Sequence, residues 1–149
     1  MTRPDVAVGD LVHGAAVYVD AAPMKTMAAL LADPNPIHWD ARVVAELGLG
    51  DQPINQGPLN MGYIHTMLAD WAGGRDRIRE FHVRFLGNVF AGQTVRAGAE
   101  LTAVRDGPDG RLIDCEVWLD VDGADRALAG TATVVMAGTA TDEAEDRHE

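Results

Sequence analysis

Residues 57–71 constrain the fold most, because the apolar side chains of this stretch surround most of a helix drawn through it. They are not confined to one stripe, as the positions show: Leu59, Met61, Tyr63, Ile64, Met67, Leu68 and Trp71. A helix that is apolar on most of its surface is a buried helix. We therefore expect 57–71 to form an interior helix, ended by Gly73 and Gly74, that the rest of the chain must cover.

Beyond residue 79 the hydrophobic pattern changes from the period of a helix to the period of strands. Apolar and polar residues alternate in 81–85, 94–104 and 113–121, and 127–136 is more continuously apolar. Such alternation is typical of antiparallel strands with one solvated face. The turn residues at 106–110 and the Asp-Gly pair at 122–123 indicate how consecutive strands connect.

The helices and strands that we expect before residue 57 are shorter than those after it, and turn residues are more frequent there. We expect a strand at 11–19, a helix beginning near Pro23 and stopped by 33–36, and a short helix at 40–47 closed by Gly48. The fold class is then α+β, with an antiparallel sheet of four or five strands wrapped around one buried helix. Because such a sheet has an open edge, we also expect a dimer.

Composition limits the domain count and the partners. The 149 residues fit one domain, which we place at 1–138. The tail at 139–149 carries five acidic residues against one arginine and is predicted to be disordered. The whole chain has a formal net charge of −11, which argues against non-specific binding to nucleic acid or to an anionic membrane.

The single cysteine and the absence of long apolar runs indicate the compartment. Cys115 has no partner for an internal disulfide or a thiolate metal site, which favours a reducing environment. The N-terminus has no signal-like apolar region, and no apolar run reaches the roughly 18 residues of a membrane span. We therefore expect a cytoplasmic protein without a metal centre.

One short segment has the residue types of general acid–base chemistry. It reads Asp33-Pro34-Asn35-Pro36-Ile37-His38. A carboxylate stands five residues before an imidazole, and the two prolines stiffen the connection, which suits groups that must be held in place. From the spacing alone a plain turn is the more common explanation, because Asx and Pro residues cluster in turns for backbone reasons.

The start of the interior helix adds a second feature. Gly57 follows Gln56 and precedes Pro58, so its amide stands at a helix N-terminus, where backbone N–H groups favour negative charge. A glycine that only permits a tight loop-to-helix turn would look the same in the sequence.

Together these residues resemble a known family. The segment 33–38 is similar to the D-x-N-P-(I/L/V)-H motif of MaoC-like, R-specific enoyl-thioester hydratases and dehydratases, which have the hotdog fold. The order and spacing of later segments resemble this family over roughly 5–137, notably its actinobacterial 3-hydroxyacyl dehydratase subunits. The resemblance implies a hotdog dimer, a catalytic pair of Asp33 and His38, and the Gly57 amide as oxyanion donor.

The resemblance also implies a reaction and its needs. The chain would add water to trans-2-enoyl thioesters with R specificity, or dehydrate 3-hydroxyacyl thioesters, in fatty-acid or related acyl metabolism. The acyl group would be carried by coenzyme A or an acyl carrier protein, and no further cofactor is implied. By the same analogy Asn35 supports the bend by hydrogen bonding.

Some residues depart from the family pattern. Relatives usually carry His before the glycine, where this chain has Gln56, and small or apolar residues at Asn60 and His65. Together with Asn35 and Arg84, a possible phosphate contact, these are the candidate substrate-binding residues. A core histidine at position 65 and a solvated or ion-paired arginine at 84 are the more common structural explanations.

Two alternatives to a simple hydratase stay open. The polar residues at 56, 60 and 65 could belong to a hotdog dehydratase or cyclase adapted to polyketide-like chains. The chain could instead be a non-catalytic subunit that pairs with a second hotdog chain in a heteromer. The intact Asp33 and His38 pair speaks against the second alternative.

Overall fold

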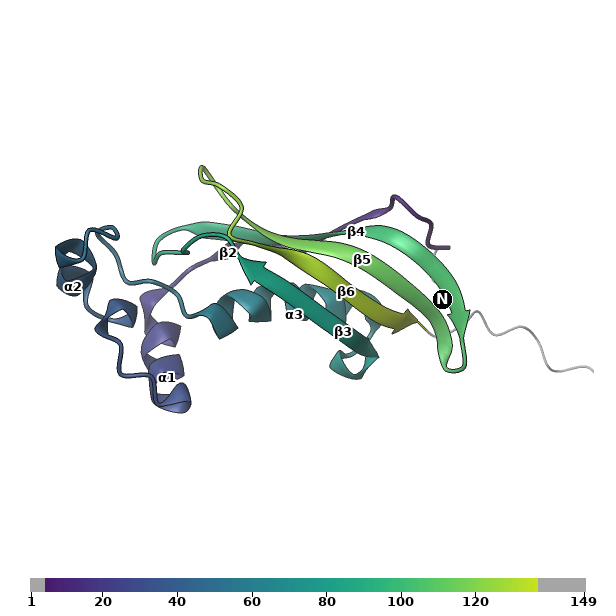
Figure 1. Cartoon of the computed structure of the whole chain (residues 1–149), viewed down its shortest axis with the longest axis horizontal. Helices are drawn as coiled ribbons and strands as arrows, with labels where there is room; N and C mark the ends of the chain where they lie inside the picture. The colour runs from purple at the N-terminus through teal and green to yellow at the C-terminus, as the bar shows by residue number, and fades with distance from the viewer. Residues whose placement is uncertain (1–4, 137–149) are drawn as a thin grey trace, which may run out of the picture.

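The computed structural model describes residues 5–136 and shows a curved antiparallel sheet with a long helix along one face (Figure 1). The strands are β1 (Leu11–His13), β2 (Val17–Tyr18), β3 (Ile78–Phe85), β4 (Thr94–Gly107), β5 (Gly110–Val121) and β6 (Leu128–Met136). The helices are α1 (Ala21–Leu31), α2 (Ala41–Glu46) and α3 (Gly57–Ala72), with short 3-10 helices η1 (Pro36–His38) and η2 (Arg75–Arg77). The predicted α+β class and the hotdog arrangement are confirmed, but the sheet within 5–136 has six strands where four or five were expected.

The sheet order is β1-β4-β5-β6-β3, and β2 also pairs with β4. The prediction of one strand over 11–19 was wrong, because β1 and β2 are separate short strands on the same neighbour. Gly14 lies between them, and its N–H donates to the Ala97 carbonyl at 2.9 Å. A Cβ at Gly14 would already be 3.4 Å from the Met67 side chain of α3. The strand therefore breaks at a weak β-former that packs against the helix.

The core lies between α3 and the face of the sheet that meets it. Alternate residues of β5, from Ile113 to Val121, are buried on this face, as the period of two predicts. Ile64 and Leu68 are buried where α3 meets the sheet, whereas Met61 and Tyr63 are half-buried. The interior helix is therefore confirmed on its sheet side, and part of its apolar surface stays accessible in a single chain.

Two expectations concern the rest of the chain. Cys115 is buried in the core, and this burial raises the pKa of its thiol to about 11, so it is packed as a small apolar residue. No helix within 5–136 has both the length and the apolar character needed to cross a bilayer. The predicted acidic tail at 139–149 lies outside the described residues.

Gly130 and Gly62 form a matched pair for testing this packing. A Cβ at Gly130 of β6 would overlap the His82 carbonyl oxygen and lie 2.7 Å from Val83 Cα, both in the backbone of β3. We expect Gly130→Ala to lower the free energy of unfolding by about 1–3 kcal/mol, as overpacking usually does. Gly62 of α3 has open space at its Cβ position, so Gly62→Ala should raise that free energy by about 0.5–1 kcal/mol. Urea denaturation measures both, and equal stability of the two variants would contradict the packing.

Candidate active site

The bend after α1 brings the predicted carboxylate and imidazole together. Helix α1 ends at Ala32, whose φ of 50° is left-handed, and the Asp33 N–H turns back to the Ala28 carbonyl at 3.0 Å. Prolines on both sides of Asn35 prevent the helix from continuing. Oδ2 of Asp33 lies 3.3 Å from Nε2 of His38, with side-chain exposures of 36% and 10%.

Hydrogen bonds to the backbone hold the bend in this shape. Oδ1 of Asp33 accepts from the Asn35 N–H at 3.1 Å, which leaves Oδ2 for His38. Oδ1 of Asn35 accepts from the Ile37 N–H at 3.3 Å and caps η1. Asn35 therefore has the bonds of a residue that supports the loop.

His38 joins the bend to the loop that precedes α3. Its Nδ1 lies 2.7 Å from the Ile54 carbonyl oxygen in a buried position. A carbonyl can only accept, so Nδ1 carries the proton and donates, and in the neutral ring Nε2 keeps its lone pair. The Ile54 N–H donates in turn to the Ile37 carbonyl at 2.9 Å, so two bonds hold the loop against η1.

Gly57 begins α3 with an unused amide. The N–H groups of Leu59 and Asn60 both donate to the Gln56 carbonyl, and Pro58 has none. Within residues 5–136 the Gly57 N–H has no acceptor, so it is available at the positive end of the helix dipole. The three residues from Ile54 to Gly57 can span at most about 10 Å, which limits how far the amide can lie from the Ile54 residue that His38 contacts.

Phe85 covers the same turn of the helix. A Cβ at position 57 would lie 3.0 Å from the Phe85 ring, so the ring packs directly on the glycine. Glycine at this position therefore permits the close approach of the aromatic ring.

Gln56 and Asn60 are held by other parts of the chain. Nε2 of Gln56 donates to the Met24 carbonyl at 2.7 Å, which ties the start of α3 to α1. Its Oε1 is buried and has no partner among the described residues. Oδ1 of Asn60 accepts from Nδ2 of Asn55 at 2.8 Å. Sequence reasoning did not single out Asn55, because an asparagine in a loop usually needs no further explanation.

His65 is not brought to the Asp33–His38 pair within one chain. Its Nδ1 lies 2.9 Å from the Arg75 guanidinium, and its ring meets Phe81 edge-on at 5.4 Å. Since a guanidinium only donates, Nδ1 accepts. Partial burial and the charge of Arg75 lower the pKa of His65, so the ring is held neutral.

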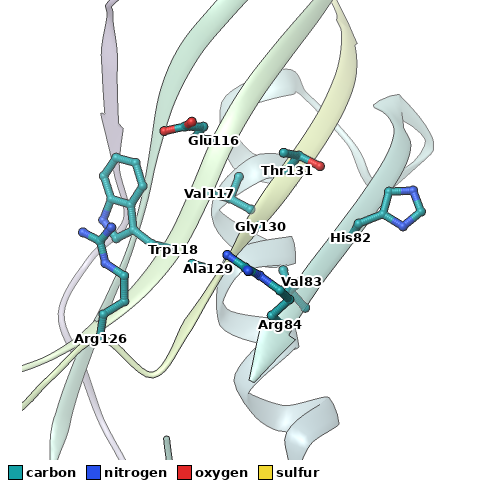
Figure 2. A pocket seen from close by; sticks show the side chains of 10 residues that line it. All are labelled: His82, Val83, Arg84, Glu116, Val117, Trp118, Arg126, Ala129, Gly130 and Thr131. Carbon is teal, nitrogen blue, oxygen red and sulfur yellow. The ribbon is translucent and has the colours of Figure 1, made fainter. Parts of the chain in front are cut away.

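Arg84 lies on the face of the sheet opposite α3, which we call the outer face. Its neighbour Val83 packs against the core, so Arg84, one residue on, points the other way. It lines a cavity of about 470 Å³ with Trp118 and Arg126, and Figure 2 shows the side chains around it. The predicted phosphate contact therefore lies on the outer face, in a cavity that neither Asp33 nor His38 lines.

The described cavities do not include the pair. Cavities of about 470, 330 and 590 Å³ are lined by none of Asp33, His38 and Gly57. In the part of the chain from 5 to 136, no group of three or more His, Cys, Asp or Glu side chains is placed to hold a metal ion. What the site offers is a water-accessible carboxylate, an imidazole lone pair and a backbone donor.

Comparisons with known proteins agree with this fold. A family model described as "MaoC like domain" matches residues 7–119. An (R)-hydratase from A. caviae, described as involved in PHA biosynthesis, is 26% identical with a TM-score of 0.77 over 90% of this chain and 99% of its own. No curated protein sequence matches the chain.

Two solved complexes from Mycobacterium tuberculosis share the fold at lower identity. The ChsH1-ChsH2 complex matches at 22% identity and a TM-score of 0.73, over 89% of this chain and 99% of the matched chain. The HadBC (3R-hydroxyacyl-ACP dehydratase) complex matches at 14% identity and a TM-score of 0.68, over 85% and 95%.

The tautomer of His38 can be tested directly. Because Nδ1 donates to Ile54, we expect neutral His38 to be the Nδ1–H tautomer, which is detected by ¹⁵N chemical shifts and two-bond couplings of the ring. His82, which is exposed on the outer face, serves as the reference ring in the same spectrum. A dominant Nε2–H form at His38 would contradict the bond to Ile54.

Proposed function

Since this chain belongs to the MaoC-like domain family, we propose that it catalyses the R-specific hydration of trans-2-enoyl thioesters and the reverse dehydration of 3-hydroxyacyl thioesters. The observation that carries the proposal is the 3.3 Å approach of Asp33 Oδ2 and His38 Nε2, in a chain whose Gly57 amide is free at the start of α3 among the described residues. These three groups have the roles that such a reaction requires: two proton-handling groups and one donor for a developing oxyanion.

The two side chains suit one water molecule. With the Nδ1 proton engaged by Ile54, Nε2 of His38 and Oδ2 of Asp33 are both acceptors, so each can take one hydrogen of the same water. The water oxygen then forms a bond to C3 of the enoyl group as one of the two groups removes its proton. The group that removed this proton then delivers it to C2, which completes the addition and regenerates the starting state, and dehydration follows the same steps in reverse.

The Gly57 amide suits the charge that grows between these proton transfers. As the bond to C3 forms, the electrons of the double bond move toward the thioester carbonyl, whose oxygen becomes enolate-like. A preorganised N–H stabilises this oxygen more than the neutral ground-state carbonyl, and the helix dipole acts in the same direction. Besides water, the proposed reaction needs only the thioester itself, on coenzyme A or a carrier protein.

A short enoyl thioester is a better first substrate than a polyketide-like chain. The alternative of a dehydratase or cyclase for polyketide-like chains rests on Gln56, Asn60 and His65. Each of these side chains has a partner within the chain, in Met24, Asn55 and Arg75 respectively. A short enoyl-CoA is therefore the substrate with which we would begin.

We expect the protein to act as an oligomer. The half-buried apolar side chains of α3 and the unpaired edge of β3 are surfaces that a second hotdog chain would cover. Light scattering of the purified protein should give at least twice the 15.9 kDa of one chain. A monomer that becomes active only with a second hotdog chain would support the heteromeric alternative, and an active monomer would contradict oligomeric action.

The catalytic pair is tested by substitution. We expect Asp33→Asn and His38→Gln each to lower kcat for hydration of crotonyl-CoA by about 10²–10⁴-fold, because each removes one proton-handling group. Loss of the conjugated enoyl absorbance measures the rate. Asp40→Asn is the matched control, since Asp40 caps α2 and asparagine caps a helix equally well. Full activity of Asp33→Asn would refute the proposed role of the pair.

A further inference from the structure

A buried hydrogen bond between two asparagines spans the turn that presents the Gly57 amide. Nδ2 of Asn55 donates to Oδ1 of Asn60 at 2.8 Å, and the two residues stand on either side of the first turn of α3. The backbone between them contains Gly57, whose N–H is free among the described residues. The bond therefore closes a loop of side chains and backbone around the proposed oxyanion donor.

Both asparagines are fixed in the interior. Their exposures are 4% for Asn55 and 3% for Asn60. The Asn55 backbone N–H donates to the carbonyl of fully buried Val89 at 2.7 Å, and its Nδ2 also lies 3.3 Å from the Tyr63 hydroxyl. Buried polar groups with several partners of this kind hold the backbone in one arrangement.

The first turn of α3 lacks a side-chain cap. Gln56 stands at the N-cap but makes no side-chain cap bond, because its amide reaches Met24 instead. The usual device that orders a helix start is therefore missing. The bond from Asn55 to Asn60 supplies a connection across the turn from outside the helix to its fourth residue.

We propose that Asn55 and Asn60 are positioning residues that orient the Gly57 N–H toward the thioester oxygen. This inference rests on the proposed function and deepens it. Neither side chain needs to touch the substrate; each acts through the amide. An oxyanion donor stabilises the transition state only when it is held at hydrogen-bond distance from the developing charge, and a displacement near 1 Å can cost about 10²-fold in rate.

The role predicts a particular kinetic pattern. Asn55→Leu and Asn60→Leu should each lower kcat on crotonyl-CoA by about 10–100-fold, with KM changed by less than about threefold, because the amide matters most in the transition state. The double variant should be no slower than the slower single variant, because both substitutions break the same bond.

Thr133→Val is the matched control for losing a buried hydrogen bond. Oγ1 of Thr133 donates to Asp114 at 2.7 Å from β6 to β5, and Thr133 is as buried as the asparagines. We expect this variant to keep kcat within about twofold of the wild type. Asn60→Ser, which is too short to reach Asn55, carries the same expectation as Asn60→Leu and replaces it if the leucine variant does not fold by circular dichroism.

The outcomes separate this inference from the proposed function. Wild-type kcat in a folded Asn60→Leu or Asn60→Ser variant, a raised KM at unchanged kcat, or multiplicative losses in the double variant would each overturn the positioning role and leave the hydratase proposal intact. A wild-type protein that hydrates no enoyl thioester would overturn the proposed function, and the positioning role with it.

Discussion

The buried hydrogen bond from His38 to the Ile54 carbonyl is the interaction on which the site depends. It joins two segments that are sixteen residues apart, the bend after α1 and the loop before α3. The same bond determines which tautomer the neutral imidazole adopts, because a carbonyl oxygen accepts only from a ring nitrogen that carries a proton. One contact therefore determines both where the ring lies and which of its nitrogens faces Asp33.

Further contacts connect the loop before α3, and the first residue of α3, to other elements of the fold. Gln56 ties the loop to α1 through Met24, Asn55 ties it to Val89, and Phe85 of β3 packs on Gly57. The loop from 53 to 56 is buried although it has no regular structure. A buried loop must satisfy its backbone groups by such bonds, and in doing so it becomes rigid enough to present a helix amide in a defined direction.

The sheet divides the chain's polar residues between two environments. Asp33 contacts His38, which is hydrogen-bonded to the loop before α3, and Asn55 of that loop is bonded to Asn60 of α3. Arg84, Trp118 and Arg126 share the outer face, where Arg126 stacks 4.7 Å over the Trp118 ring. Strand alternation makes this division unavoidable, since neighbouring residues of one strand point to opposite faces. Arg84 therefore points away from α3, although its sequence neighbours Val83 and Phe85 pack toward that helix.

Local pattern was enough to predict several features. The bend at 33–38, the helix from Gly57 and the alternating strands follow from proline restriction, apolar periodicity and turn residues, all of which act within a few positions. The break at Gly14, the partners of Gln56, Asn60 and His65, and the face occupied by Arg84 were not predictable in this way. Each depends on which distant segment packs beside the residue, as Met24 does for Gln56 and Arg75 for His65, and local sequence pattern does not specify such partners.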